Sequence, residues 1–317
     1  MHRGSLVAAA AAAAVTLGSV AAQSSSSTSA TTTYHTVAVD GLNVFYREAG
    51  PRDAPTLLLL HGFPSSSRMF DSLIPLMADH YHVIAPDYPG FGQSDAPPPS
   101  QYSYTFDHLA STVDHLIAIL GIKSYVLYLQ DYGGPVGFRL ALAHPDRVKA
   151  IIIQNAVAHE DGLGPAWDER KAYWKDRAAY EQKVISNFLS LETTKQRHIG
   201  SSPNVDRYDP NTWTDEFAHL SQPGQFQIQA DLFYDYRTNV AAYPTWQRWM
   251  RYRQPPMLVV WGKYDPSFAI AGAAAYQRDV PNAQVHVLDA GHFALDEKTD
   301  EIAALVSTFL ATLNLGD

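Results

Sequence analysis

The stretch Leu127-Tyr128-Leu129-Gln130-Asp131-Tyr132-Gly133-Gly134 decides the fold of this chain of 317 residues. An apolar strand ends here, a polar residue stands at a tight turn, and two glycines let a helix start close to the strand. A strand, turn and helix in this order hold the turn residue above the end of a sheet, where it can react with a bound molecule. That residue is Asp131, and the predicted chemistry depends on it.

Strands and helices alternate on both sides of this stretch. We expect strands at residues 36–39, 43–47, 56–60, 82–85, 125–129, 148–153, 257–261 and 284–288. We expect helices at residues 68–78, 106–120, 133–144, 268–279 and 301–313. This alternation predicts an α/β fold with a mostly parallel, doubly wound sheet.

The alternation stops between residues 157 and 254, where the sequence is mostly helical and polar. This segment contains five of the six tryptophans: Trp167, Trp174, Trp213, Trp246 and Trp249. A helical block inserted in an α/β domain is typical of a cap, and its aromatic side chains can either line a pocket or only join the cap to the core. We therefore predict a core at residues 34–156 and 255–317 and a helical cap at residues 157–254.

The N-terminal segment predicts export. Arg3 precedes an apolar run at residues 6–20, which ends in Val20-Ala21-Ala22. This is the layout of a signal peptide over residues 1–22, although an uncleaved membrane anchor is the alternative. Residues 23–33 are rich in Ser and Thr and predict a disordered leader. We expect a secreted, extracellular protein without membrane contact after cleavage.

The composition excludes several classes of protein. The 23 basic and 32 acidic residues give a net charge of −9, which disfavours a nucleic-acid partner. The absence of cysteine excludes disulfides, thiolate metal sites and a cysteine nucleophile. We find no HExxH motif, no GxGxxG after the first strand and no phosphate-binding lysine loop. We therefore expect neither metal nor cofactor, with a small apolar substrate and water as the reactants.

Three further motifs follow expected strands. His61-Gly62-Phe63-Pro64 follows the third strand, Trp261-Gly262-Lys263-Tyr264-Asp265 ends with a carboxylate, and Asp289-Ala290-Gly291-His292-Phe293 follows the last strand. The carboxyl ends of parallel strands meet at one edge of a sheet. The chain order Asp131, Asp265, His292 is therefore the order of a nucleophile, an acid and a histidine at such an edge.

These motifs resemble the α/β-hydrolase superfamily, in the branch of the haloalkane dehalogenases and epoxide hydrolases, over about residues 35–315. Residues 83–87, 90–95 and 130–134 look like dehalogenases, whereas residues 61–64 are similar to epoxide hydrolases. The resemblance implies an α/β-hydrolase fold, Asp131 as nucleophile, His292 as base and Asp265 as its partner. It also implies that the amides of Phe63 and Tyr132 form an oxyanion hole.

The sequence departs from the family pattern at two places. Leu129 stands where the family usually has glycine two residues before the nucleophile. Some dehalogenases carry the acid after the preceding core strand, where this chain has Gln154-Asn155, so Asp265 is the better candidate.

An aspartate nucleophile fits attack on an sp³ carbon. A serine would leave a stable ether, whereas a carboxylate leaves an ester that water can cleave. His292 would deprotonate that water, and the Phe63 and Tyr132 amides would bind the oxyanion.

The leaving group separates the two activities. Dehalogenases usually place tryptophan after the nucleophile, where this chain has Tyr132, although a cap tryptophan, Trp167 or Trp174, could donate to a halide. Epoxide hydrolases use cap tyrosines to protonate the opening ring. The stretch Tyr236-Arg237-Thr238-Asn239 is similar to the place of one such tyrosine, which makes Tyr236 the candidate. Tyr173 and Tyr180 compete for the second position.

We therefore predict a hydrolase with Asp131, His292 and Asp265 as its triad, and Tyr236, Trp174, Tyr173 and Trp167 as cap residues facing substrate. Epoxide hydrolysis is the first predicted activity, and haloalkane dehalogenation is the alternative. An esterase or lactonase, an enzyme that opens epoxides intramolecularly to form rings, and a non-catalytic binder of small apolar molecules stay open.

Overall fold

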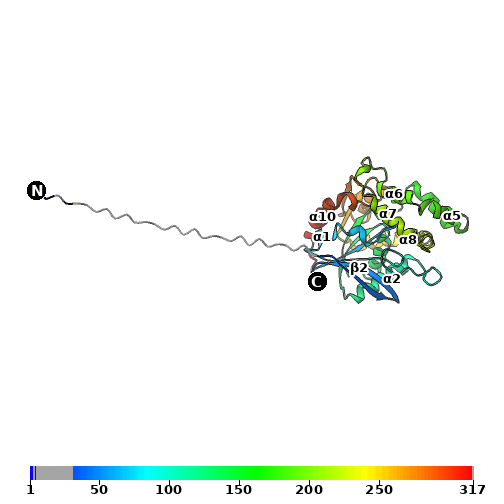
Figure 1. The fold of residues 1–317 in the computed structure, drawn as a ribbon, viewed down its shortest axis with the longest axis horizontal. Coiled ribbons are helices and arrows are strands. Elements are labelled where there is room, and N and C mark those ends of the chain that lie inside the picture. The colour runs from blue at the N-terminus through cyan, green and yellow to red at the C-terminus, as the bar shows by residue number, and fades with distance from the viewer. Residues whose placement is uncertain (3, 5–30, 316–317) are drawn as a thin grey trace.

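The computed structural model describes residues 1–2, 4 and 31–315 (Figure 1). The predicted signal peptide and most of the predicted leader lie outside the described residues. Strand β1, Thr33–Val39, begins at the last residue assigned to that leader. Thr33 belongs to the sheet because it pairs with Glu48 and donates its hydroxyl to the carbonyl of Glu48 at 3.0 Å.

Eight strands form one sheet in the order β1-β2-β4-β3-β5-β6-β7-β8. Strands β1 and β2 pair antiparallel, as do β2 and β4, and all other neighbours are parallel. The remaining strands are β2 Leu42–Ala49, β3 Thr56–Leu60, β4 His82–Pro86, β5 Tyr125–Gln130, β6 Val148–Gln154, β7 Met257–Gly262 and β8 Gln284–Leu288. The predicted α/β-hydrolase fold with its mostly parallel sheet is confirmed.

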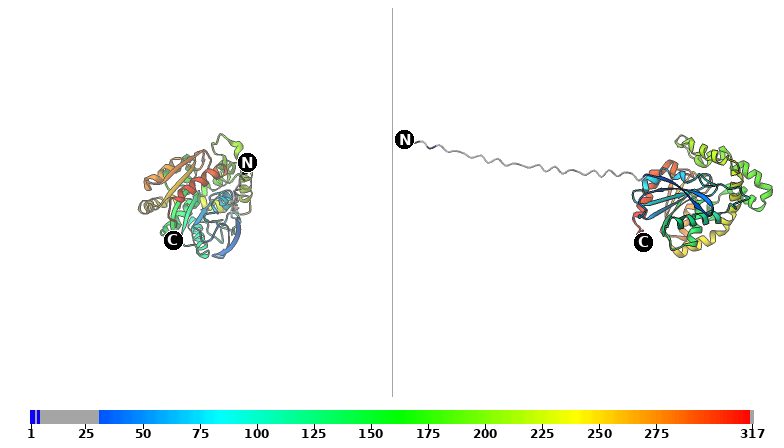
Figure 2. Two further views of the ribbon diagram at one scale, coloured as in Figure 1. Left: turned by 90° about the vertical axis from the view of Figure 1, so that its left-hand side faces the viewer. Right: turned by 60° about the horizontal axis from the view of Figure 1, so that its bottom comes forward.

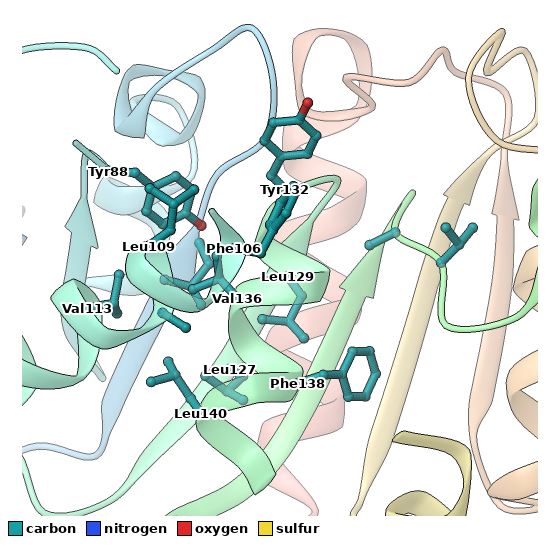
Figure 3. Packing of buried hydrophobic residues seen from close by; sticks show 14 of the residues in the cluster. Tyr88, Phe106, Leu109, Val113, Leu127, Leu129, Tyr132, Val136, Phe138 and Leu140 are labelled. Carbon is teal, nitrogen blue, oxygen red and sulfur yellow. The ribbon is translucent and has the colours of Figure 1, made fainter. Parts of the chain in front are cut away.

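Both faces of the sheet are buried, which explains why its central strands are apolar throughout. Leu58 and Leu60 join one hydrophobic cluster, whereas Leu57 and Leu59 join the other. Helices α2 (Phe106–Ile119), α3 (Gly133–Ala143) and α9 (Ala271–Asp279) contribute to the first cluster, and α1 (Ile74–Met77) and α10 (Leu295–Ala311) to the second. Figure 3 shows side chains of β5, α2 and α3 in the first cluster, with the Tyr132 hydroxyl directed away from them.

Three expected helices differ from the structure. The helix expected at residues 301–313 is α10, which begins earlier, at Leu295, and ends at Ala311. Instead of one helix at residues 68–78, a 3-10 turn η1 at Ser67–Phe70 precedes the short α1, which has Pro75 in its first turn. Proline fits a helix start because its fixed φ suits that position and no N–H is needed there. Helix α9 begins at Ala271 rather than at Phe268, because the amides of Ser267 and Phe268 donate to the carboxylate of Asp265.

The chain between β6 and β7 forms the helical segment predicted as a cap. It contains η2 Glu160–Gly162, η3 Pro165–Trp167, α4 Asp168–Lys175, α5 Arg177–Phe188, α6 Leu191–Ile199, η4 Val205–Arg207, α7 Pro210–Leu220 and α8 Gln225–Arg253. Figures 1 and 2 show α5, α6 and α7 gathered at one end of the molecule. The long α8 returns toward the core and contacts α2, α3 and α9. Within the described part of the chain, no helix combines the length and apolar character needed to cross a membrane.

Candidate active site

The carboxyl ends of four strands bring the predicted core residues together. Phe63 follows β3, Asp131 follows β5, Asp265 follows β7 and His292 follows β8. These strands are neighbours in the parallel part of the sheet, apart from β6 between β5 and β7. Four side chains that are far apart in the sequence therefore meet at one edge of the sheet.

Asp131 occupies a strained turn. Its φ of 47° lies in the left-handed region, which non-glycine residues rarely adopt outside functional sites. Gly133 makes the turn possible, because a Cβ there would collide with the carbonyl of Leu60. Oδ1 of Asp131 accepts the amide N–H of Phe63 at 3.0 Å and that of Tyr132 at 2.7 Å. The other oxygen, Oδ2, lies 3.5 Å from Nε2 of His292 and is free to attack a substrate.

His292 is fully buried between two carboxylates. Its Nδ1 lies 2.8 Å from Oδ2 of Asp265, and its Nε2 faces Asp131. Burial alone would lower the pKa of His292, but the charges and hydrogen bonds of Asp265 and Asp131 raise it to about 10. The imidazole is therefore protonated at neutral pH in the free enzyme.

Two amide side chains that the sequence analysis did not assign to the site support the triad. Asn155 donates its Nδ2–H to Oδ2 of Asp265 at 2.7 Å, and its Oδ1 accepts the amide of Gly262 at 2.8 Å. The side-chain nitrogen of Gln130 lies 3.0 Å from Nε2 of His292. Asn155 directly follows β6, the strand after which some dehalogenases carry the acid of the triad. This position was the one signal in the sequence that could have identified Asn155 as a site residue.

A small cavity lies above Asp131. Core and cap both line it, through Phe63, Asp131, Tyr132, Trp167, Arg170, Arg197, Phe233, Tyr236, Ser267 and Phe268. Most of these side chains are apolar or aromatic, and Asp131 is the one acid among the described lining residues. A largely apolar cavity suits a small molecule.

Tyr236 is the cap tyrosine that reaches this cavity. It lies on α8, is buried, and its hydroxyl has no hydrogen bond of ordinary geometry among the described residues. The hydroxyl of Tyr243 approaches it without such a bond. Burial raises the pKa of Tyr236 well above its ordinary value, and the charge of Asp131 adds to this effect. The hydroxyl of Tyr132 is also buried and unpaired, with a similarly raised pKa.

Two of the four predicted cap residues do not line the cavity. Tyr173 donates its hydroxyl to the carbonyl of Ala230 at 3.0 Å, so it joins α4 to α8. Trp174 stacks parallel to Tyr236 with ring centroids 6.3 Å apart, and its indole N–H donates to the carbonyl of Phe233. The residue of α4 that lines the cavity is Arg170 instead, which the sequence gave no reason to select.

Trp167 lines the cavity as predicted, but its indole N–H is already used. It donates to the carbonyl of Ser267 at 2.7 Å. Since the N–H of Trp174 is also bonded to a backbone carbonyl, neither predicted indole can donate to a departing halide without breaking a hydrogen bond.

His61 supports the loop that carries Phe63. Its ring is fully buried, stacks on Tyr88 at 4.1 Å, and accepts the amide N–H of Tyr88 at 3.3 Å. Burial lowers the pKa of His61, so the ring is neutral. Across the described residues, no group of three His, Asp or Glu side chains is arranged to hold a metal ion.

Similarities to known proteins extend over core and cap. The family model described as the α/β hydrolase fold matches residues 55–299. A protein described as an uncharacterized hydrolase of Saccharomyces cerevisiae is 43% identical over 284 residues, covering 88% of this chain and 97% of that protein. A haloalkane dehalogenase of Psychrobacter cryohalolentis is 28% identical over 279 residues, covering 85% and 88%. The solved structure of a haloalkane dehalogenase loop variant from Bradyrhizobium elkanii matches with a TM-score of 0.68 at 25% identity, covering 89% of this chain and 97% of that one.

Proposed function

Because this chain belongs to the α/β-hydrolase fold family, we propose that it is a hydrolase which opens small epoxides through a covalent ester on Asp131. The observation that carries the proposal is that Tyr236 lines the same cavity as Asp131 and that its buried hydroxyl has no hydrogen bond of ordinary geometry among the described residues. An opening epoxide develops negative charge on oxygen, and a positioned O–H can protonate that oxygen.

The first step uses the free oxygen of Asp131. Oδ2 attacks a ring carbon, the bond from that carbon to the ring oxygen breaks, and its electron pair stays on the oxygen. Tyr236 protonates this alkoxide, which leaves a hydroxyalkyl ester on Asp131 and a tyrosinate. The remaining oxygen, Oδ1, keeps the N–H groups of Phe63 and Tyr132 as its donors.

Ester formation prepares His292 for the second step. The charge and hydrogen bond of Asp131 help to raise the pKa of His292 in the free enzyme. Once Asp131 is an ester this contribution is lost, so the pKa of His292 falls. A net proton transfer from the imidazole restores the Tyr236 hydroxyl and leaves His292 neutral.

Neutral His292 then serves as the base for hydrolysis. It takes a proton from water while the water oxygen attacks the carbonyl carbon of the Asp131 ester. The oxyanion forms at Oδ1, where two backbone amides already donate. Collapse breaks the bond between that carbonyl carbon and the ester oxygen, and the diol takes the proton from His292. Asp131 is left as a carboxylic acid that contains the oxygen of the water, and it returns its proton to His292, which restores the starting state.

His292→Gln tests the covalent intermediate, because glutamine cannot deprotonate the water. The variant is incubated separately with 1,2-epoxybutane, 1-bromobutane and p-nitrophenyl acetate, followed by intact mass and peptide mapping. A gain of the whole epoxide mass on Asp131 is expected, with no such gain in His292→Gln combined with Asp131→Ala. Because the chain has no cysteine, thiol alkylation cannot imitate this result. Ester cleavage by the wild type without any adduct on Asp131 would contradict the mechanism.

Tyr236→Phe tests the role of the hydroxyl. We expect kcat with an epoxide to fall about 100-fold or more, because a positioned general acid contributes on this scale. Tyr173→Phe is the matched control on the cap, since the Tyr173 hydroxyl is bonded to a backbone carbonyl outside the cavity. Equal kcat values for Tyr236→Phe and the wild type would exclude Tyr236 as the acid.

Haloalkane dehalogenation is the second candidate. It is supported by the similarity to a haloalkane dehalogenase at 28% identity and by two guanidinium groups in the cavity that could stabilise a leaving anion. The occupied indole N–H groups of Trp167 and Trp174 weigh against it. Transfer of the butyl group alone to Asp131 with release of bromide, in the experiment above, would favour this candidate over epoxide hydrolysis.

A further inference from the structure

Two buried cations form part of the cavity roof. Arg170 on α4 is 7% exposed and Arg197 on α6 is 4% exposed, and both line the cavity above Asp131. The guanidinium of Arg170 lies over the Trp167 ring at 4.4 Å, and that of Arg197 lies over the Phe63 ring at 4.5 Å. Aromatic faces hold the two planar groups in place.

Neither guanidinium has an ion-pair partner among the described residues. Among the described residues, Nε of Arg170 and Nη1 of Arg197 have no hydrogen-bond partner, whereas Nη2 of Arg197 donates to the carbonyl of Phe188 at 2.8 Å. Arg177, by contrast, is more exposed and yet is paired with Glu181 and Asp231. The cap thus leaves these two buried arginines without an ion-pair partner among the described residues, whereas the partly exposed Arg177 is paired.

Burial without an ion-pair partner among the described residues lowers the pKa values of both guanidinium groups. Desolvation, together with the charge of Arg170, lowers the pKa of Arg197 to about 9, and desolvation also lowers the pKa of Arg170. Glu216, whose charge also acts on Arg197, is already hydrogen-bonded to His198 at 2.8 Å. The remaining unpaired N–H groups need an anion, because a buried charge without a partner is strongly unfavourable.

The proposed reaction removes the one acid that lines the cavity. Asp131 carries the negative charge that acts on both guanidinium groups in the free enzyme. When Asp131 becomes an ester, that charge is lost, whereas both guanidinium groups still line the cavity. An anionic group on the substrate would balance them throughout the reaction.

We propose that Arg170 and Arg197 form a subsite for a carboxylate group of the substrate, so that the enzyme acts on small epoxy acids. The identity of the reacting ring rests on the proposed function, whereas the anion subsite rests on the two guanidinium groups alone. A carboxylate can accept from both groups at once, and guanidinium forms its strongest hydrogen bonds with such acceptors. A halide ion is the competing occupant.

The small size of the cavity and its aromatic walls limit the size of the acid. Glycidate, an oxirane with a carboxylate on a ring carbon, is the smallest substrate of this class. Glycidamide has nearly the same shape without the charge. This pair isolates the contribution of the negative charge.

Binding tests the subsite without any reaction. Propanoate, propanamide and sodium bromide are titrated into the wild type, and the dissociation constants are measured by ligand-observed NMR. We expect propanoate to bind at least about 10-fold more tightly than propanamide, because it gains charge-assisted hydrogen bonds. Tighter binding of bromide than of propanoate, or equal binding of propanoate and propanamide, would overturn the carboxylate subsite.

Substitutions at the arginines test whether these residues account for the preference for propanoate. In Arg197→Met we expect the propanoate preference to fall about 10-fold or more, with partial retention in Arg197→Lys. Arg207→Met removes a charge from an exposed cap position outside the cavity and should leave the preference unchanged. Circular dichroism verifies folding. Equal losses in Arg197→Met and Arg207→Met would show that net charge, and not this subsite, determines the preference.

Turnover distinguishes failure of the subsite from failure of the proposed function. For the wild type we expect kcat/KM to be about 10- to 100-fold higher with glycidate than with glycidamide, and Arg170→Met or Arg197→Met to reduce this ratio. Equal turnover of both oxiranes would overturn the epoxy-acid assignment and leave epoxide hydrolysis intact. Arginine-dependent propanoate binding without opening of either oxirane would keep the subsite and overturn the proposed reaction.

Discussion

Two buried histidines have similar surroundings in this protein, but only one of them lies beside the cavity. His292 lies between Asp265 and Asp131, and His198 lies between Asp296 and Glu216. Burial alone would lower both pKa values, yet the acidic neighbours raise the pKa of His292 to about 10 and that of His198 to about 9.

The geometry of the two clusters separates their roles. His198 on α6 uses both ring nitrogens in short contacts, 2.7 Å to Asp296 on α10 and 2.8 Å to Glu216 on α7, so it joins cap to core. Its ring also stacks on Phe293 at 4.3 Å. His292 has one short contact and one of 3.5 Å to an aspartate that lines the cavity. A protonated imidazole between carboxylates can therefore serve stability or chemistry, and what decides is whether one of these carboxylates lines the cavity, as Asp131 does.

The largest expected effect is the loss of kcat when His292 is replaced. His292→Gln should lower kcat at least about 1,000-fold, because the base for ester hydrolysis is lost. His198→Gln should keep kcat within about 10-fold of the wild type when measured on folded protein, since no atom of His198 lines the cavity. Steady-state kinetics below the unfolding transition of each variant makes the comparison. Similar losses of kcat would mean that His198 also takes part in the chemistry.

The two substitutions should affect the free energy of unfolding in the opposite order, with the larger loss in His198→Gln. His198→Gln leaves the buried Glu216 without its cation and also removes the partner of Asp296, which should lower the free energy of unfolding by about 3–5 kcal/mol. His292→Gln should cost less, because Asp265 keeps the N–H donors of Asn155, Ser267 and Phe268. Urea denaturation of both variants measures the difference. A loss below about 1 kcal/mol in His198→Gln would refute its anchoring role.

The pH dependence of stability tests the charge on His198. Its pKa in the folded state is about 9, above the ordinary value of 6.5, so the folded state binds the proton more tightly. The resulting stabilisation is fully present below about pH 6.5 and is lost as the pH rises through about 9, with a size of about 3 kcal/mol. Because His292 titrates in a similar range, the quantity to measure is the difference between the wild type and His198→Gln from pH 6 to 10. A constant difference would mean that His198 is not charged.

The smallest expected effect concerns the support of Asp265. Asn155→Gly removes one donor to Asp265 but tolerates the backbone φ of 43° at this position. We expect kcat to fall about 5- to 30-fold, because one hydrogen bond to a charged group is lost while two backbone donors remain. Asn187→Gly, at an exposed cap asparagine bonded to Glu169, is the control and should leave kcat unchanged. An unchanged kcat in Asn155→Gly would show that the two amides suffice.

The core part of the site could be predicted because each residue is tied to a strand end. Asp131, Asp265, His292 and Phe63 follow apolar stretches that are recognisable as buried parallel strands, and parallel strands place their carboxyl ends at one edge. The structure places these residues within hydrogen-bonding distance, or 3.5 Å for His292 and Asp131. Topology alone carries this information, so no knowledge of side-chain packing was needed.

The cap part could not be predicted in the same way. Tyr173 and Trp174 were expected to line the cavity and do not. Arg170 and Arg197 line it, although no sequence pattern predicted them. An arginine on a polar helix is normally exposed, and nothing local distinguishes Arg197 from the partly exposed Arg177. Which face of a cap helix turns inward depends on how the helices pack on each other and on the core.

The sequence by itself determined the α/β-hydrolase fold, the extent of the helical segment between β6 and β7, and the order of the reactive groups along the sheet edge. These features follow from local patterns and from the rules of strand connection, which act over short stretches of chain. Only the tertiary structure decided that Tyr236, Arg170 and Arg197 meet above Asp131 and that His198 joins cap to core. Such contacts depend on the rotation of each helix about its axis, which is set by packing across the whole molecule.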